Sequence, residues 1–90
     1  MYCVYVLEDS VSKIKYIGYT NNIKRRLEEH KNQKGGHTTK QHKDWKLIYC
    51  ELYLNQEDAL GREKFLKSGS GWRFLSKQLK YYLQKRSKNG

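Results

Sequence analysis

Residues 2–20 read YCVYVLEDSVSKIKYIGYT and contain two short runs of apolar, aromatic and β-branched residues. The runs, residues 2–7 and 15–20, predict two strands, and the polar segment between them predicts a turn. Strands joined in this way most simply form an antiparallel hairpin. Side chains alternate between the two faces of a strand, so Tyr5 and Tyr16 can meet across this hairpin, with Gly18 as a bare position beside them.

The rest of the chain predicts alternating helices and strands. Asn21 or Asn22 can cap a helix that runs to about Lys31, and residues 45–54 form a third strand. Asn55, with Asp58 in the capping-box position, begins a second helix that ends at Gly69 in a left-handed C′ position. A third helix runs from residue 71 to about residue 83.

This order, β-β-α-β-α-α, predicts an α+β fold in which helices flank a three-stranded, mainly antiparallel sheet. Ninety residues suffice for one small domain, which we expect over residues 1–84, followed by a basic tail over residues 85–90. Residues 32–44 are polar and rich in glycine, and predict a surface loop. The 13% share of aromatic residues supplies a core.

The charge of the chain is strongly positive and unevenly placed. Lys and Arg number 19 against nine Asp and Glu, a net charge of +10, and residues 64–90 hold eight basic and no acidic residues. Such a block attracts phosphate backbones, although it can also be a solubilising segment. On the third helix, Arg73, Lys77 and Lys80 share a stripe next to the apolar one and are candidates for phosphate contacts.

No apolar run approaches the roughly 20 residues of a membrane span. The residues that follow Met1 resemble neither a basic leader nor a cleavage site, so we expect a cytoplasmic protein that does not bind membranes.

Helical geometry singles out two ionisable residues, since successive residues turn by about 100°. On the first helix, Arg26 borders the apolar face, Arg25 points to water, and His30 lies one turn beyond Arg26. On the second helix, Glu63 falls inside the apolar stripe, where a charge is costly unless it is paired or binds a metal. Two interpretations stay open: an Arg26–Glu63 salt bridge, or a one-carboxylate metal site beside an arginine.

These residues together resemble the GIY-YIG endonuclease family, especially its small, single-domain bacterial members. Residues 3–5 (CVY) and 16–18 (YIG) resemble the paired signature, and residues 23–27 (IKRRL) resemble the arginine segment of the first helix. His30 stands where many members carry a histidine. Residues 59–63 (ALGRE) resemble the segment with the metal-binding glutamate, and residues 67–71 (KSGSG) match a further segment. Two departures are Cys3 in place of the usual glycine and the lack of a late asparagine.

The resemblance implies a divalent-metal-dependent endonuclease that hydrolyses DNA phosphodiester bonds, with Mg²⁺ or Mn²⁺ on Glu63. It implies that Arg26 neutralises the charge of the transition state, that Tyr16 orients the phosphate or the water, and that Tyr5 or His30 is the base. Cations near Tyr5 would lower its pKa for that task. Substrate contacts are expected from these residues: Gly18, Lys15, Lys67, Arg73, Lys77 and Lys80.

We expect cutting that depends on DNA structure or only weakly on sequence, in repair or recombination, with a protein partner as a possible source of specificity. Two alternatives from other classes stay open. One is a catalytically weak or inactive nucleic-acid-binding module on the same fold. The other is a small basic protein of the ribosome, which would bind RNA without depending on a metal.

Overall fold

The computed structural model describes residues 1–32 and 44–89. Its elements are β1 (Tyr2–Asp9), β2 (Lys15–Thr20), α1 (Ile23–Lys31), β3 (Trp45–Tyr53), α3 (Gln56–Leu66), α4 (Gly69–Gln78) and α5 (Lys80–Asn89). Most of the loop expected over residues 32–44 lies outside the described residues. None of the helices in the described ranges is long and apolar enough to cross a membrane.

The three strands form one antiparallel sheet in the order β2-β1-β3, which confirms the predicted α+β fold and its hairpin. β1 lies in the centre, and every residue from Cys3 to Asp9 is buried. The strand is two residues longer than predicted because Glu8 still pairs with Lys15 on β2, and Asp9 with Trp45 on β3. Val6 lies opposite Tyr49 and Leu7 opposite Leu47, so one extra residue of β3 bulges there.

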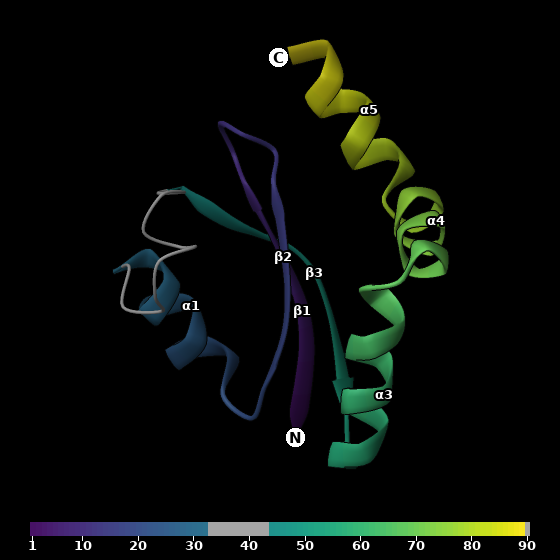
Figure 1. Ribbon diagram of the computed structural model, residues 1–90. Coiled ribbons are helices and arrows are strands. Elements are labelled where there is room, and N and C mark those ends of the chain that lie inside the picture. Colours follow the sequence, from purple (N-terminus) through teal and green to yellow (C-terminus); the bar gives the residue numbers. More distant parts are fainter. Residues whose placement is uncertain (33–43, 90) are drawn as a thin grey trace.

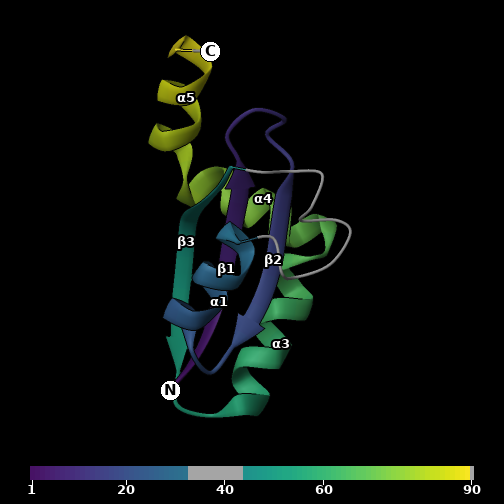
Figure 2. The same ribbon diagram turned by 90° about the vertical axis from the view of Figure 1, so that its left-hand side faces the viewer.

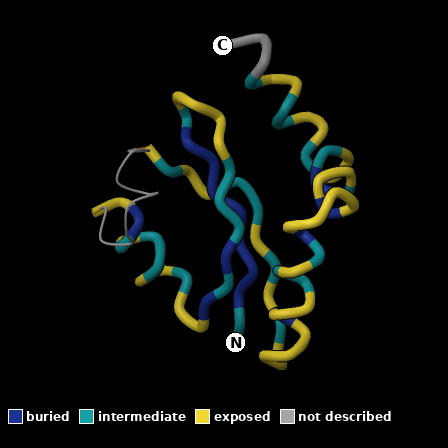
Figure 3. Tube along the Cα trace, viewed as in Figure 1, coloured by how far each residue is buried: buried dark blue, intermediate teal, exposed yellow. Residues whose placement is uncertain are grey.

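The helices cover both faces of the sheet. Figures 1 and 2 show α1 against one face and α3 with α4 against the other, while α5 extends beyond the sheet. Figure 3 shows the buried backbone concentrated on the central strand. Alternate side chains of β1 supply the two cores: Val4 and Val6 pack with Ala59, Leu66 and Leu75, whereas Cys3, Tyr5 and Leu7 pack toward α1.

The helix starts follow the predictions in part. Asn22 caps α1, and its side chain accepts a hydrogen bond from the backbone N–H of Arg25 at 3.0 Å. Asn55 occupies the N-cap of α3, but its side chain makes no capping hydrogen bond, so the predicted capping box with Asp58 does not form.

The predicted end of the second helix was wrong. α3 ends at Leu66, and Gly69 is the first residue of α4 rather than a left-handed C′ residue. The reason is that Ser68 caps α4, its hydroxyl accepting from the N–H of Gly71 at 3.2 Å. A Cβ on Gly71 would lie 2.2 Å from the carbonyl oxygen of Phe65, so the lack of a side chain there lets α3 and α4 approach closely.

The single third helix expected over residues 71–83 was also wrong, because the chain forms two helices. α4 stops at Gln78, Leu79 leaves helical geometry with φ −106° and ψ 27°, and α5 begins at Lys80. The change of direction lets Tyr82 and Arg86 reach the buried carboxylate of Glu8, with contacts of 2.6 Å and 2.9 Å.

Candidate active site

Two tyrosines and a histidine gather on the face of the sheet that α1 covers. The rings of Tyr5 and Tyr16 stack with centroids 6.2 Å apart, and His30 meets the ring of Tyr16 edge-on at 4.8 Å. The Oη of Tyr5 lies 3.4 Å from Nε2 of His30. Tyr5 and His30 are buried and Tyr16 is half-buried, so Tyr16 is the phenol of this cluster that is open to solvent.

Arg26 joins the cluster from the border of α1, as its position on the helix predicted. Its Nε donates to the Oη of Tyr5 at 3.1 Å, and its Nη1 pairs with Oε1 of Glu29 at 3.0 Å. The hydrogen bond to Tyr5 is the largest of the contacts that raise the pKa of Arg26, which therefore stays charged at every accessible pH. Arg25, its neighbour in sequence, is exposed.

Burial sets the protonation states of Tyr5 and His30. The pKa of Tyr5 is raised because burial outweighs the hydrogen bond from Arg26, which acts in the opposite direction. The sequence led us to expect that nearby cations would lower the pKa of Tyr5. Arg26 does act in that direction, but the desolvation of the buried phenol raises the pKa by more. The pKa of His30 is lowered, first by burial and then by the charge of Arg26. The cluster thus holds a neutral phenol next to a neutral imidazole.

Gly18 makes room for a side chain of the protein itself. A Cβ at this position would lie 2.5 Å from the Oη of Tyr5 and 3.0 Å from a ring carbon of Tyr16. The bare position expected to admit a substrate backbone is therefore filled by two tyrosine rings. A glycine is required here because any side chain would displace the phenol that Arg26 binds.

Glu63 lies in the opposite layer, on α3. Its side chain is 21% exposed, and its Oε2 pairs with Nζ of Lys67 at 3.0 Å. The Arg26–Glu63 salt bridge considered from the sequence is absent from the described residues, where Arg26 pairs with Glu29 instead. The charge of Glu63 nevertheless acts on the buried cluster, since it contributes to the raised pKa of Tyr5.

The carboxylate of Glu63 fits a hard divalent cation. Mg²⁺ keeps several of its waters and needs only one or two protein carboxylates when a substrate phosphate supplies another ligand. No group of three or more His, Cys, Asp or Glu side chains with metal-binding geometry occurs within residues 1–32 and 44–89. A metal on Glu63 would have to displace the ammonium of Lys67. The side chain of Lys67 is 54% exposed, so its ammonium can move into solvent.

A pocket lies at the edge of β2, between this strand and the α3–α4 junction. It encloses about 450 Å³ and is lined by Lys15, Tyr16 and Ile17 from β2 and by residues around the α3–α4 junction, among them Lys67 and Trp72. Tyr16 belongs both to this pocket and to the cluster of Tyr5 and His30. The edge of β2 is thus where a substrate can touch residues of both layers.

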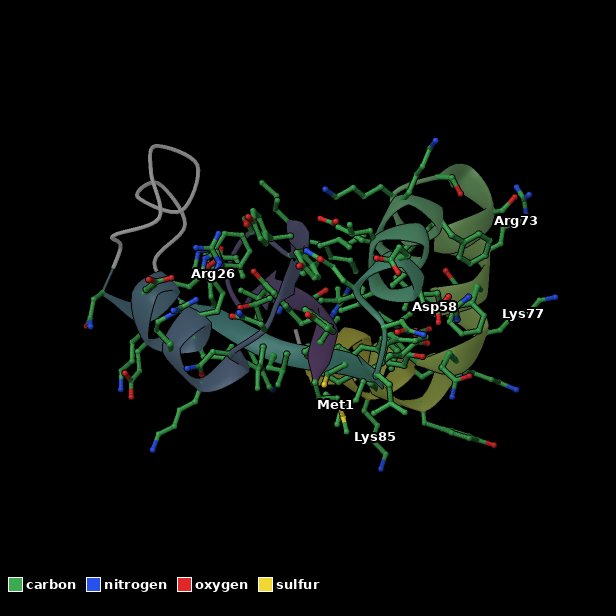
Figure 4. The ribbon with its side chains drawn as sticks, turned by 90° about the horizontal axis from the view of Figure 1, so that it is seen from below. Met1, Arg26, Asp58, Arg73, Lys77 and Lys85 are labelled. Carbon is green, nitrogen blue, oxygen red and sulfur yellow. The ribbon has the colours of Figure 1, made fainter. Side chains whose placement is uncertain are left out.

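The three basic residues predicted on the third helix do not join the cluster. Figure 4 shows Arg26 beside α1 on one side of the sheet and Arg73 and Lys77 on the outer side of α4, pointing away from the sheet. Nη2 of Arg73 donates to the hydroxyl of Ser70 at 2.8 Å. Lys80 belongs to α5, so the expected single stripe of three cations is split between two helices.

The sequence interpretation missed three polar partners near the site. Glu29 accepts from Arg26, and its spacing three residues later along α1 was the available signal. Glu51 on β3 binds Arg62, and buried Glu8 binds Lys15 and Arg86; these pairs join residues too far apart in sequence for a spacing rule to find.

Comparisons with known proteins identify relatives of this chain. A model of the GIY-YIG catalytic domain matches residues 1–73. A UPF0213 protein of Bacillus cereus is 33% identical over 84 residues, which cover 93% of this chain and 81% of that protein. A UPF0213 protein of Clostridium perfringens is 34% identical over 64 residues, 71% of this chain and 68% of that protein.

A solved structure of a related protein has a similar fold. The solution NMR structure of a UPF0213 protein from Bacillus halodurans aligns with a TM-score of 0.54 and 27% identity, covering 87% of this chain and 85% of that one. Since the family model spans most of the chain and the relatives are long matches, the chain belongs to the GIY-YIG family, whose fold is that of a nuclease.

Proposed function

We propose that this protein is a divalent-metal-dependent endonuclease that hydrolyses DNA phosphodiester bonds. The observation that carries the proposal is the hydrogen bond of Arg26 to the buried phenol of Tyr5, beside Tyr16 and His30, in a domain of the GIY-YIG family. A guanidinium at a cluster of phenols stays charged and can bind two phosphate oxygens in bidentate fashion.

The exposure of each side chain suggests its role in the reaction. Arg26 binds the non-bridging phosphate oxygens and neutralises the charge that grows on them in the transition state. Tyr16, which is half-buried, orients the phosphate or the attacking water by a hydrogen bond. A Mg²⁺ or Mn²⁺ ion bound by Glu63 would supply Lewis-acid stabilisation of the leaving oxygen.

Tyr5 and His30 form the proton-accepting pair. Because Arg26 donates to Tyr5, the hydroxyl proton of Tyr5 is free to point at Nε2 of His30, 3.4 Å away. Loss of that proton to the neutral imidazole would leave a phenolate beside Arg26, which would take a proton from the attacking water once substrate binding brings water to the buried Oη of Tyr5. The raised pKa of Tyr5 makes this unfavourable in the free protein, so substrate and metal must assist it.

The test is a titration of plasmid nicking with Mg²⁺, comparing the wild type with Glu63→Gln. Glu57→Gln is the matched control, since Glu57 is an exposed carboxylate on the same helix. We expect metal-dependent nicking in the wild type and the control, and loss of nicking in Glu63→Gln. Equal nicking by all three proteins would exclude Glu63 as the metal ligand.

The same titration separates the alternatives. A binding module without activity would retain DNA without nicking it at any Mg²⁺ concentration, and a ribosomal protein would prefer RNA. We retain the endonuclease because Tyr5, Tyr16, Arg26, His30 and Glu63 are all present. A role in repair or recombination in the cytoplasm, selection of DNA by its structure, and help from a protein partner belong to the same proposal.

A further inference from the structure

We propose that the pocket between β2 and α4 binds an unpaired nucleobase of the substrate, which stacks on the indole of Trp72. The proposal rests on the proposed function and narrows it, because the preferred DNA would carry an unpaired nucleotide next to the bond that is cut. The pocket, its exposed aromatic ring and the charge around it carry the argument.

Trp72 is exposed where a tryptophan would ordinarily be covered. It lies in the first turn of α4, it is 46% exposed, and it lines the pocket of about 450 Å³. That volume falls in the range of roughly 300–1,000 Å³ typical of small-ligand sites. The contact of Gly71 with the backbone of α3 fixes the start of α4, so the ring stands on a rigid support.

Lys15 holds the indole in place from one side. Its ammonium lies 4.5 Å from the ring centroid of Trp72 and 3.1 Å from Oε2 of Glu8. The ion pair with buried Glu8 keeps the ammonium over the ring, and the cation–π contact keeps the ring from turning. A ring that is held in this way and still nearly half exposed loses little entropy when a base stacks on it.

The position of the pocket connects it to the proposed chemistry. Tyr16 lines the pocket and also stacks with Tyr5 in the catalytic cluster. A base on Trp72 would therefore place its neighbouring phosphate next to Tyr16, the residue that the pocket shares with the cluster. Lys67, the ion-pair partner of Glu63, lines the same pocket, so the carboxylate proposed to bind the metal is in contact with a residue of the pocket.

The charge around the pocket favours a polyanion over an apolar peptide. Lys15 and Lys67 line the pocket itself, and from Gly69 to Asn89, a range that includes α4, the chain holds six basic and no acidic residues. Stacking on an aromatic ring combined with a basic surface is how proteins bind single-stranded nucleic acid with little sequence preference. A paired base has both faces covered by its neighbours in the duplex and cannot stack in the same way.

The experiment measures binding in EDTA, where no cutting occurs, with two DNA molecules that share one strand containing 2-aminopurine. The complementary strand pairs with the 2-aminopurine in one molecule and leaves it unpaired in the other. We expect quenching of the 2-aminopurine on binding to the wild type. Trp72→Leu, which keeps apolar volume without a π-face, should weaken binding of the unpaired DNA on the order of tenfold and leave duplex binding unchanged. Trp72→Phe should retain most of the affinity.

Tyr81→Ala is the matched control, because Tyr81 is 71% exposed and carries Lys80 over its ring, yet belongs to α5 and does not line the pocket. We expect it to bind both DNA molecules like the wild type. The proposal is overturned if Trp72→Leu binds the unpaired DNA as the wild type does, or if it loses both DNA molecules equally while its circular dichroism spectrum is unchanged.

Nicking of a plasmid in Mg²⁺ separates this proposal from the one on which it rests. If the wild type nicks but Trp72→Leu binds unpaired DNA normally, the pocket proposal fails and the nuclease proposal stands. If the wild type does not nick at all, the nuclease proposal fails, whereas a loss of unpaired-DNA binding in Trp72→Leu still supports the pocket.

Discussion

His30 is a buried histidine that the surrounding residues keep neutral. Its side chain is 2% exposed, and its Nδ1 makes no hydrogen bond within the described residues. Burial and the charge of Arg26 lower its pKa below the usual 6.5, and only Glu29 acts in the opposite direction. A proton is therefore bound more weakly by His30 in the folded chain than in the unfolded chain.

This difference predicts that acid destabilises the fold through His30. Below about pH 6.5 the unfolded chain binds a proton that the folded chain does not, so the free energy of unfolding falls as the pH falls. We expect urea denaturation to show this loss between about pH 7.5 and pH 5.5 in the wild type and a smaller loss in His30→Gln. The pKa of buried Glu8 is lowered from 4.5, so its own contribution is lost only at lower pH. Equal losses in both proteins would contradict the prediction.

Arg26 and Arg25 are neighbours in sequence with different tasks. Arg26 donates to Tyr5 through Nε, which a lysine cannot reproduce, whereas the side chain of Arg25 is exposed. We expect Arg26→Gln and Arg26→Lys to lower the rate of metal-dependent nicking at least about 100-fold. Arg25→Gln should retain the rate. If the Arg25 and Arg26 variants lost the same share of the nicking rate, Arg26 would not be the residue that binds the phosphate.

Single residues of the site differ in how far the sequence could reveal them. The helical turn of about 100° per residue was enough to separate Arg26 from Arg25, because burial on one side of a helix follows its period. The role of Gly18 was not accessible in this way. It depends on where the ring of Tyr5 falls, and therefore on packing between β1, β2 and α1.

At the scale of elements, an ion pair between two partly buried side chains joins α3 to β3. Arg62 donates from Nε and Nη2 to the two carboxylate oxygens of Glu51, at 2.8 Å and 3.0 Å. Tyr49 and Tyr53 also donate to this carboxylate, and the guanidinium lies over the ring of Phe74 at 4.3 Å. The pair fixes the helix that presents Glu63, the next residue along.

Arg62→Leu should lower the free energy of unfolding by about 2–3 kcal/mol, because it leaves a partly buried carboxylate without its cation. Urea denaturation measures the change. Arg25→Leu, at an exposed position, is the control and should stay within about 0.5 kcal/mol of the wild type. A similarly small effect of Arg62→Leu would mean that apolar packing alone holds α3.

The element boundaries that depend on local signals were predicted, and those that depend on distant partners were not. Residues 15–20 are a short run of mainly aromatic and β-branched residues, and Asn22 caps α1 through its own neighbours, so both limits agree with the structure. No Gly or Pro in the sequence marks the break between α4 and α5. It follows from Glu8, which binds Tyr82 and Arg86 from the other end of the chain.

For the whole molecule, the sheet edge at β2 joins the two proposed parts of the site. Arg26 lies on the α1 side (Figure 4), the pocket with Trp72 lies toward α4, and Tyr16 both lines this pocket and stacks with Tyr5. A single strand that leaves the pocket over Trp72 and follows α4 would pass along the outer side of that helix. Arg73 and Lys77, one turn apart and both exposed, are the cations on that path.

This path predicts how DNA binding depends on salt. Each phosphate contact on a single strand contributes about 0.7 to the slope of log affinity against log salt concentration. If Arg73 and Lys77 each contact a phosphate, the double variant Arg73→Gln/Lys77→Gln should make this negative slope shallower by about 1.4 for DNA with a single-stranded flank. Lys85→Gln removes an exposed charge that Figure 4 shows on another side of the molecule, so the slope should not change. An unchanged slope in the double variant would mean that the strand takes another course and that these cations only add to the general positive field.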